Sequence, residues 1–327
     1  MGRSVHLSKS KLISGWQCPK RLWLEVNARE DSHYAPESEV AFAVVHQVGE
    51  AARSIFPEGI LIEHDQQLSE AIRETQERLA ASDPVTLFEA TLQAEGVLIR
   101  ADVLTREALD EYHLIEVKAA TGIKDYYLVD CAIQLGVAKR ARLPIRRLEL
   151  AHIDNQLVYE GNGNYRGLFT FVDVVDECQE LQGEMDRLVG EMRELLTGKE
   201  PAIAMGPHCT DPFDCPFQEF CAGPQPEMPV HWLPGGVSAA NKLMDSGYFD
   251  IRDIPAGFLS NEMAERCRQV AVSGLFFLDP VAAEELRGLG WPRYYFDFET
   301  MAPAVPKFIG TRPYNAQAFQ WSCHVEH

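Results

Sequence analysis

Asp102 and the tripeptide Glu116-Val117-Lys118 have the residue types and spacing of a site that binds a divalent metal ion. Glu116 and Lys118 are two residues apart, so on a strand they share one face. Thirteen residues separate Asp102 from Glu116, which allows a hairpin that places the two acids on neighbouring antiparallel strands. Two converging carboxylates suit Mg²⁺ or Mn²⁺, because both ions prefer oxygen ligands, and a lysine beside them can orient or deprotonate a water molecule.

A solvated strand face is the alternative interpretation of Glu116-Val117-Lys118, since an acid followed two residues later by lysine is common by chance. Leu114, Ile115 and Val117 nevertheless make this segment apolar enough for a central strand. An ionised residue in a central strand needs an opposite charge or a metal ion. The flanking residues therefore favour a site.

Three cysteines in the second half of the chain form another group with the character of metal ligands. Cys209, Cys215 and Cys221 have five residues between each neighbouring pair, in a stretch rich in proline. A fourth thiolate is needed to close a tetrahedral site or to bind a cubane cluster, and Cys18 is the best candidate. Residue count alone leaves zinc and iron-sulfur both open. The remaining cysteines are predicted to be structural: Cys131, Cys178, Cys267 and Cys323.

The elements that must position these residues are those of an α/β fold. Strands are predicted at 86–94, 97–105, 112–119 and 147–153, with the turn signal Glu95-Gly96 between the first two. Helices are predicted at 38–54, 68–80 and 124–140. From residue 38 the order is helix, three strands, helix, strand, with the helix at 68–80 inserted before the strands. An N-terminal helix capped by Ser8 or Ser10 precedes this core, and a strand at 168–174 and a helix at 177–196 follow it.

This order, together with the acids and the lysine, resembles the RecB-like branch of the PD-(D/E)xK nuclease superfamily. The resemblance implies a metal-binding histidine on the first core helix, where His46 stands, and a glutamine after the lysine strand, where Gln134 stands. It implies that Mn²⁺ or Mg²⁺ is held by His46, Asp102, Glu116 and the Val117 carbonyl. The catalytic residues it implies are Asp102, Glu116, Lys118 and Gln134. The usual aromatic residue four positions after the glutamine is absent, since Ala138 stands there.

The cysteine pattern resembles the iron-sulfur staple found in RecB-like nucleases, including CRISPR-associated single-strand nucleases. In those proteins one N-terminal cysteine and three C-terminal cysteines hold a [4Fe-4S] cluster that closes the nuclease fold. The resemblance implies that Cys18, Cys209, Cys215 and Cys221 bind such a cluster here. It covers residues 8 to about 222, roughly two-thirds of the chain.

A third motif lies near the end of the sequence, in the aromatic segment that carries Asp297 and Glu299. It resembles the first motif of DEDD-type exonucleases, whose fold is RNase H-like, and two acids so spaced can share metal ions. The 27 residues after Thr300 do not supply the other acids of such a site. The predicted organisation is a nuclease domain at 1–225, a helical linker at 226–290 and the beginning of a truncated RNase H-like domain at 291–327.

Composition sets limits on the partners of this chain. The 327 residues are 46% apolar, so the chain can bury a core, and 30 basic against 49 acidic residues give a formal net charge of −19. That balance argues against nucleic-acid binding by the whole surface but allows a local basic groove. Basic residues cluster in two places: Lys9, Lys11, Lys20 and Arg21, and then Lys139, Arg140, Arg142, Arg146 and Arg147. Tyr126 and Tyr127 are expected to stack on exposed bases.

No apolar run approaches the ~18 residues of a membrane span, and the N-terminus lacks an apolar signal core. The expectation is a cytoplasmic protein without a membrane partner. The leading hypothesis is a metal-dependent nuclease, a DNA exonuclease that acts on single-stranded or end-bearing DNA. The alternative is a non-catalytic nucleic-acid-binding module stabilised by zinc or an iron-sulfur cluster. A third hypothesis, an iron-sulfur electron carrier, does not explain the presence of Glu116 and Lys118.

Overall fold

The structure is a computed structural model that describes residues 7–28, 30, 32, 37–63, 67–81, 83–108, 110–223 and 226–327. The chain divides into two compact units. The first comprises Met1–Cys221 with Glu299–Phe319, and the second comprises Ala222–Phe298 with Gln320–His327. Residues of the predicted third region, 291–327, thus belong partly to each unit. No helix in the described part of the chain is long and apolar enough to cross a membrane.

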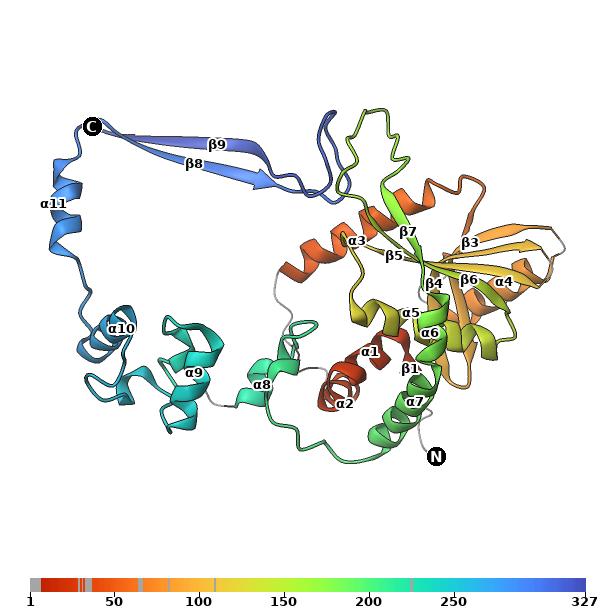
Figure 1. Ribbon diagram of the computed structural model, residues 1–327, viewed down its shortest axis with the longest axis horizontal. Coiled ribbons are helices and arrows are strands. Elements are labelled where there is room, and N and C mark those ends of the chain that lie inside the picture. The colour runs from red at the N-terminus through yellow and green to blue at the C-terminus, as the bar shows by residue number, and fades with distance from the viewer. Residues whose placement is uncertain are drawn as a thin grey trace. The chain divides into compact units, whose positions relative to one another are not determined.

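A mixed sheet forms the centre of the first unit (Figure 1). Its strands follow the order β2 (Ile60–Leu61), β3 (Val85–Ala94), β4 (Val97–Ala108), β5 (Glu111–Lys118), β6 (Ile145–Ile153) and β7 (Phe169–Asp173), and β1 (Leu7–Ser8) pairs with β4. The hairpin between β3 and β4 turns at Glu95 and Gly96, whose φ angles of 47° and 73° are the positive values that a type I′ turn requires. β5 and β6 are parallel, so a crossover must join them, and α5 (Asp125–Arg140) supplies it.

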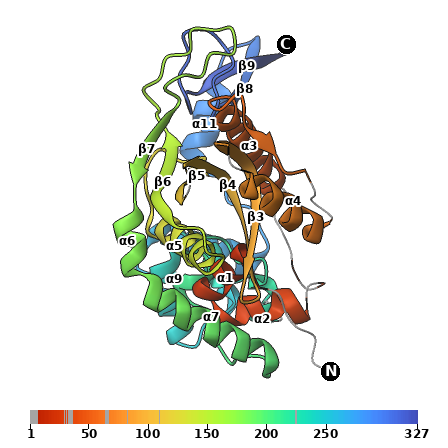
Figure 2. The ribbon, with the colours of Figure 1, turned by 90° about the vertical axis from the view of Figure 1, so that its right-hand side faces the viewer.

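The two faces of the sheet carry separate apolar cores, because successive residues of a strand point to opposite faces. Leu104 and Leu114 belong to the first core, and their neighbours Val103 and Ile115 belong to the second. The first core is covered by α1 (Lys9–Gln17), α2 (Pro19–Asn27), α4 (Leu68–Ala80), α5, α6 (Val175–Glu180) and α7 (Gln182–Thr197). The second core receives Val48 of α3 (Glu37–Arg53). Figures 1 and 2 show α1, α5 and α7 together and α3 apart from them.

The predicted order of helix, three strands, helix and strand is confirmed as α3, β3, β4, β5, α5 and β6, with α4 inserted before the strands; the short strand β2, between α3 and α4, was not predicted. The N-terminal helix begins after Ser8, whose hydroxyl accepts a hydrogen bond from the Lys11 amide. One expectation differs in detail. The single helix predicted at 177–196 is two helices, α6 and α7, which meet at Leu181.

The second unit contains α9 (Gly236–Asp245), α10 (Glu262–Ser273) and α11 (Pro280–Gly288), preceded by the short α8 (Gln218–Ala222) at the boundary. Its small apolar cluster includes Val230, Leu243 and Ile251. The strands β8 (Arg293–Met301) and β9 (Gln317–Glu326) form a separate two-stranded sheet. Asp297 and Glu299 are exposed on β8.

The loop between β8 and β9 belongs to the first unit and completes its second core. Ala304 and Val305 are buried there with residues of β6 and β7. Two backbone hydrogen bonds fix the loop, one from the Tyr159 amide to the Thr311 carbonyl at 2.9 Å and one from the Gly310 amide to the Tyr159 carbonyl at 2.8 Å. A segment near the end of the chain is therefore part of the first unit's packing.

His113 of β5 gives this unit a predicted dependence of stability on pH. The Nη2 atom of Arg147 lies 3.0 Å from His113 Nδ1, and because a guanidinium only donates, that nitrogen is an unprotonated acceptor. Burial, and then Arg147, hold the pKa of His113 below its usual value, although Glu149 lies 2.9 Å from Nε2 and acts in the opposite direction. The unfolded chain therefore takes up a proton that the folded chain resists, and stability falls as pH drops below about 6.5.

We expect the substitution His113→Gln to reduce the loss of stability that occurs as pH falls. Urea unfolding at about pH 7.5 and about pH 5.5 measures the free energy of unfolding on both sides of the ordinary histidine pKa. The wild-type chain should lose more stability between the two conditions than the variant. An equal loss in both proteins contradicts a depressed pKa at this residue.

Candidate functional site

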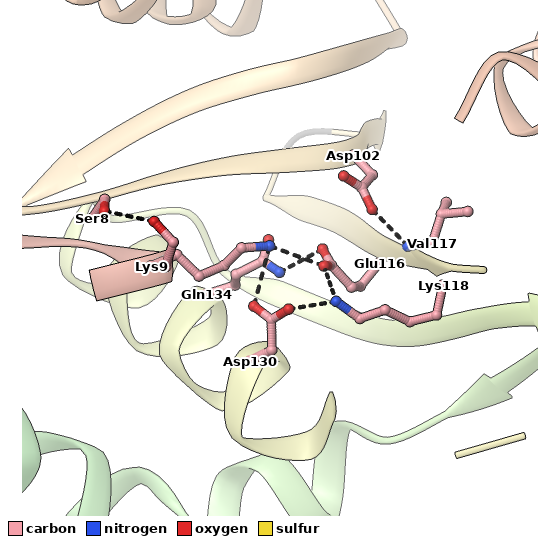
Figure 3. A network of polar contacts seen from close by, with 9 residues as sticks. Ser8, Lys9, Asp102, Glu116, Val117, Lys118, Asp130 and Gln134 are labelled. Carbon is pink, nitrogen blue, oxygen red and sulfur yellow. Dashed lines mark hydrogen bonds and ion pairs between the residues drawn. The ribbon is translucent and has the colours of Figure 1, made fainter. Parts of the chain in front are cut away.

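β4 and β5 part at the point where the two predicted acids lie. Their paired residues run from Ala108 and Glu111 to Val103 and Ile115, and one further step of the register sets Asp102 opposite Glu116. There the Val117 amide donates a 2.7 Å hydrogen bond to the Asp102 carboxylate (Figure 3). A side chain thus takes the place of a backbone partner, and it fixes Asp102 beside the strand that carries Glu116.

Glu116 is 2% exposed, and both of its carboxylate oxygens have partners. Oε1 receives the ammonium groups of Lys118 at 2.6 Å and Lys9 at 2.9 Å. Oε2 accepts a 2.6 Å hydrogen bond from the Gln134 amide. The predicted residues Glu116, Lys118 and Gln134 therefore lie in direct contact.

Asp130 completes the network from α5. It stands four residues before Gln134, so both side chains leave the same face of the helix toward the sheet. Its Oδ1 lies 3.1 Å from the Lys9 ammonium, and its Oδ2 is paired with Lys118. Figure 3 shows the two lysines reaching Glu116 and Asp130 from opposite sides.

Lys9 and Asp130 are the members of this network that the sequence interpretation missed. Lys9 belongs to a basic group expected to contact nucleic acid, whereas its partner here is Glu116, 107 residues away. Asp130 carries a signal of its own, since it is a charged residue in a helix whose other residues from Tyr127 to Ala138 are almost all buried. A charge in such a helix must meet a partner.

The buried charges shift one another's protonation. Burial would lower the pKa of Lys9, but Asp130 and Glu116 outweigh it and raise that pKa, and the same carboxylates raise the pKa of Lys118. Burial would raise the pKa of Glu116, but Lys118 and Lys9 hold it below its usual range. Burial, and then Glu116, raise the pKa of Asp102 to about 8. Near neutral pH the network therefore holds charged lysines and an ionised Glu116, while Asp102 resists ionisation.

The donor atoms here fit a divalent ion in their chemistry. Asp102 and Glu116 supply carboxylate oxygens, and the Gln134 Oε1 atom is buried without a hydrogen-bond partner. Oxygen donors of this kind are what Mg²⁺ and Mn²⁺ take. Across the described residues, however, no three or more His, Cys, Asp or Glu side chains are arranged so that they could hold a metal ion as they stand.

His46 does not lie with the other predicted ligands. It is on α3, which contributes to the second apolar core, and its imidazole is exposed and lies 3.7 Å from Glu50 one turn away. Val117 takes part through its amide, which holds Asp102. The structure thus brings together Asp102, Glu116, Lys118 and Gln134, and leaves His46 outside their contacts.

The four predicted cysteine ligands line one pocket. Cys18 lies between α1 and α2, and it shares the pocket with Cys209, Cys215 and Cys221 of the proline-rich stretch. Burial raises the pKa of the Cys215 and Cys221 thiols. Metal binding here would therefore release protons. In number and type the four thiols match the donor set of a structural zinc ion or of a [4Fe-4S] cluster, although among the described residues they are not arranged to hold a metal ion as they stand.

Gln17 ties this pocket to the N-terminal helix. Its side-chain amide donates to the carbonyls of His208 at 2.7 Å and Phe213 at 2.6 Å. The backbone of the cysteine stretch is closed by a 2.8 Å hydrogen bond from the Cys215 amide to the Cys209 carbonyl. The two bonds from Gln17 hold the stretch against α1.

Several residues expected to contact nucleic acid are used inside the fold. Tyr127 is buried, and its ring lies 5.2 Å from the Lys118 ammonium, so the expectation that it stacks on a base is wrong. Lys20 pairs with Glu200 at 3.0 Å, and Arg140 pairs with Glu95 and Asp186. Within the two predicted basic groups, three exposed residues have no ion-pair partner among the described residues: Lys139, Arg142 and Arg146.

Comparisons with known proteins add two findings. A profile described as a domain of unknown function, DUF2779, matches residues 294–327. A solved structure described as the crystal structure of SSO0001 is similar at 13% identity and a TM-score of 0.28, over 62% of this chain and 81% of that one. A search of curated proteins finds no match. None of these findings carries an activity to this chain.

We expect the cysteine pocket to hold a metal centre that depends on all four thiols. Cys18→Ser or Cys209→Ser should lower the bound iron or zinc and the melting temperature, because the centre joins segments far apart in sequence. A structural metal can contribute about 10 kcal/mol to folding. Elemental analysis and absorbance of anaerobically purified protein measure metal content and distinguish a brown cluster from colourless zinc.

Cys267→Ser is the control, since Cys267 lies in the second unit and does not line the pocket. It should leave metal content unchanged. Full metal content in Cys18→Ser contradicts the assignment of that residue to the centre.

Proposed function

We propose that this protein is a metal-dependent nuclease that hydrolyses phosphodiester bonds in DNA, with single-stranded or end-bearing DNA as its substrate. The observation that carries the proposal is the buried Glu116 carboxylate, which Lys118 and Gln134 contact directly beside Asp102. A buried group of acids and lysines costs stability unless it is well compensated, so its presence at one end of a strand pair favours a functional site.

The roles follow from the contacts. A divalent ion held by Asp102 and Glu116, with Gln134 beside them, would polarise the phosphate and lower the pKa of a bound water. Gln134 orients Glu116 through its amide, and the Val117 amide orients Asp102. Lys118 is held by Glu116 and Asp130 at the same place, where its ammonium can stabilise negative charge that develops on the phosphate.

The cysteine pocket supports a structural role for the second centre. Cys18, Cys209, Cys215 and Cys221 would bind a [4Fe-4S] cluster that fastens the N-terminal helices to the stretch after α7. Lys20 and Arg21 also line the pocket and supply positive charge near it. Four thiolates with zinc or with a [4Fe-4S] cluster carry net negative charge, so both basic residues suit either centre.

Nuclease turnover tests the proposal, with end-labelled single-stranded DNA and Mn²⁺ or Mg²⁺. Glu116→Gln keeps the side chain's shape and removes its charge, and Lys118→Met removes the ammonium. We expect each variant to lose about 10²-fold or more in rate. Melting temperatures show whether each variant folds.

Glu111→Gln is the control on the same strand, because Glu111 is exposed at the other end of β5. It should cleave at the wild-type rate. Wild-type cleavage by Glu116→Gln overturns the assignment. Loss of cleavage only in Asp297→Asn and Glu299→Gln would move the activity to β8. DNA binding without cleavage in the wild-type chain would favour a non-catalytic binding module.

The exposed basic residues in the last turn of α5 and just after it give a separate prediction for DNA binding. Replacing Lys139, Arg142 and Arg146 by Gln should weaken binding and reduce the slope of log affinity against log salt by about one for each phosphate that is no longer neutralised. Fluorescence anisotropy over a range of salt concentrations measures both quantities. Arg73→Gln, on α4 and paired with Glu77, should leave the slope unchanged, and an unchanged slope in the triple variant contradicts this patch.

A further inference from the structure

Lys9 lies in the candidate active site although it belongs to the N-terminal helix. It is the first residue of α1, and Ser8 before it both caps that helix and pairs with β4. The start of α1 is thus fixed to the strand that carries Asp102. From there the Lys9 side chain extends to Glu116 and Asp130, at 2.9 Å and 3.1 Å from its ammonium.

Four charged side chains of the network contact one another directly, and their charges balance. Lys9 and Lys118 carry two positive charges against Glu116 and Asp130, and these four groups share their contacts. Glu116 Oε1 is taken by both ammonium groups, and Oε2 by Gln134. The two ammonium groups occupy both lone-pair positions of Oε1, so an ion that binds Glu116 through Oε1 must replace one of them.

Lys9 is the partner whose side chain can move away from Glu116. Lys118 stands two residues from Glu116 on the same strand, so its position follows from β5. Lys9 reaches the network only through its own flexible stem of four methylene groups, and about a fifth (21%) of its side chain is exposed to solvent. Its ammonium can move to water without any change in the sheet.

We propose that Lys9 is a built-in counter-ion that takes the place of the divalent metal in the metal-free protein and moves out when the metal binds. The inference rests on the proposed function, because the ion concerned is that of the nuclease site. The inference goes beyond that function because it assigns to Lys9 a role in setting the affinity of the site for metal.

Mn²⁺ titration of the protein without DNA tests the proposal, with free Mn²⁺ followed by electron paramagnetic resonance. Lys9→Met keeps the length and the apolar stem of the side chain and removes the charge. It should bind Mn²⁺ about tenfold or more tightly than wild type, because one competing cation is gone. Lys9→Arg should bind no more tightly than wild type. Lys11→Met, two residues along the same helix, should match wild type.

Chemical acylation of the wild-type protein provides a second measurement that does not depend on a variant. Mass spectrometry should show that Lys9 reacts faster with saturating Mn²⁺ than without it, because the ion expels the ammonium into solvent. Lys9→Met that binds Mn²⁺ equally or more weakly overturns the proposal, as does Lys9 reactivity that is unchanged or lowered by Mn²⁺.

The same measurements separate this inference from the proposed function. Mn²⁺ that binds through Glu116, with tighter binding in Lys9→Met but no cleavage of DNA, overturns the nuclease and supports the counter-ion. Cleavage of DNA by the wild-type protein, together with an unchanged Mn²⁺ affinity in Lys9→Met, supports the nuclease and overturns the counter-ion. Absence of Mn²⁺ binding in both wild type and Lys9→Met overturns the counter-ion.

Discussion

A carboxylate that is almost completely buried in the middle of a sheet determines much of the surrounding structure. Glu116 is stable there only because opposite charges and an amide surround it, since an unpaired buried charge costs several kcal/mol. α5 must therefore place Gln134 and Asp130 over this point of β5, and the N-terminal helix must begin where Lys9 can reach it. The separation of β4 from β5 at Asp102 makes room for these groups.

The N-terminal helix connects the two candidate centres. Its first residue, Lys9, contacts the acids, and Cys18 directly after its last residue lines the cysteine pocket. The helix packs closely against α7: a Cβ atom added at Gly15 would clash with the sulfur of Met192. The candidate metal centre at the cysteines and the charges at Glu116 are thus held by one rigid element.

The sequence was sufficient to predict the order of the core elements, because alternation in the strands and a long apolar helix are local patterns. The acids and the lysine of β5 that it selected lie close together, and its four cysteines line one pocket, whereas His46 lies apart from the acids. Lys9 was assigned to the wrong environment, because an ion pair over 107 residues leaves no local pattern. The burial of Ala304 and Val305 in the first unit escaped prediction for the same reason, since only the tertiary structure brings that loop to β6 and β7.

The length of α1, nine residues, fixes the position of Lys9 relative to that of Cys18. Each residue of an α-helix advances the chain by about 1.5 Å and turns it by about 100°. An insertion or deletion of one residue between Ser8 and Cys18 would therefore rotate Lys9 away from the acids or the thiol away from its pocket, even if every side chain were kept. At this place the number of residues is under as strict a constraint as their chemistry, and sequence change here is limited to substitution.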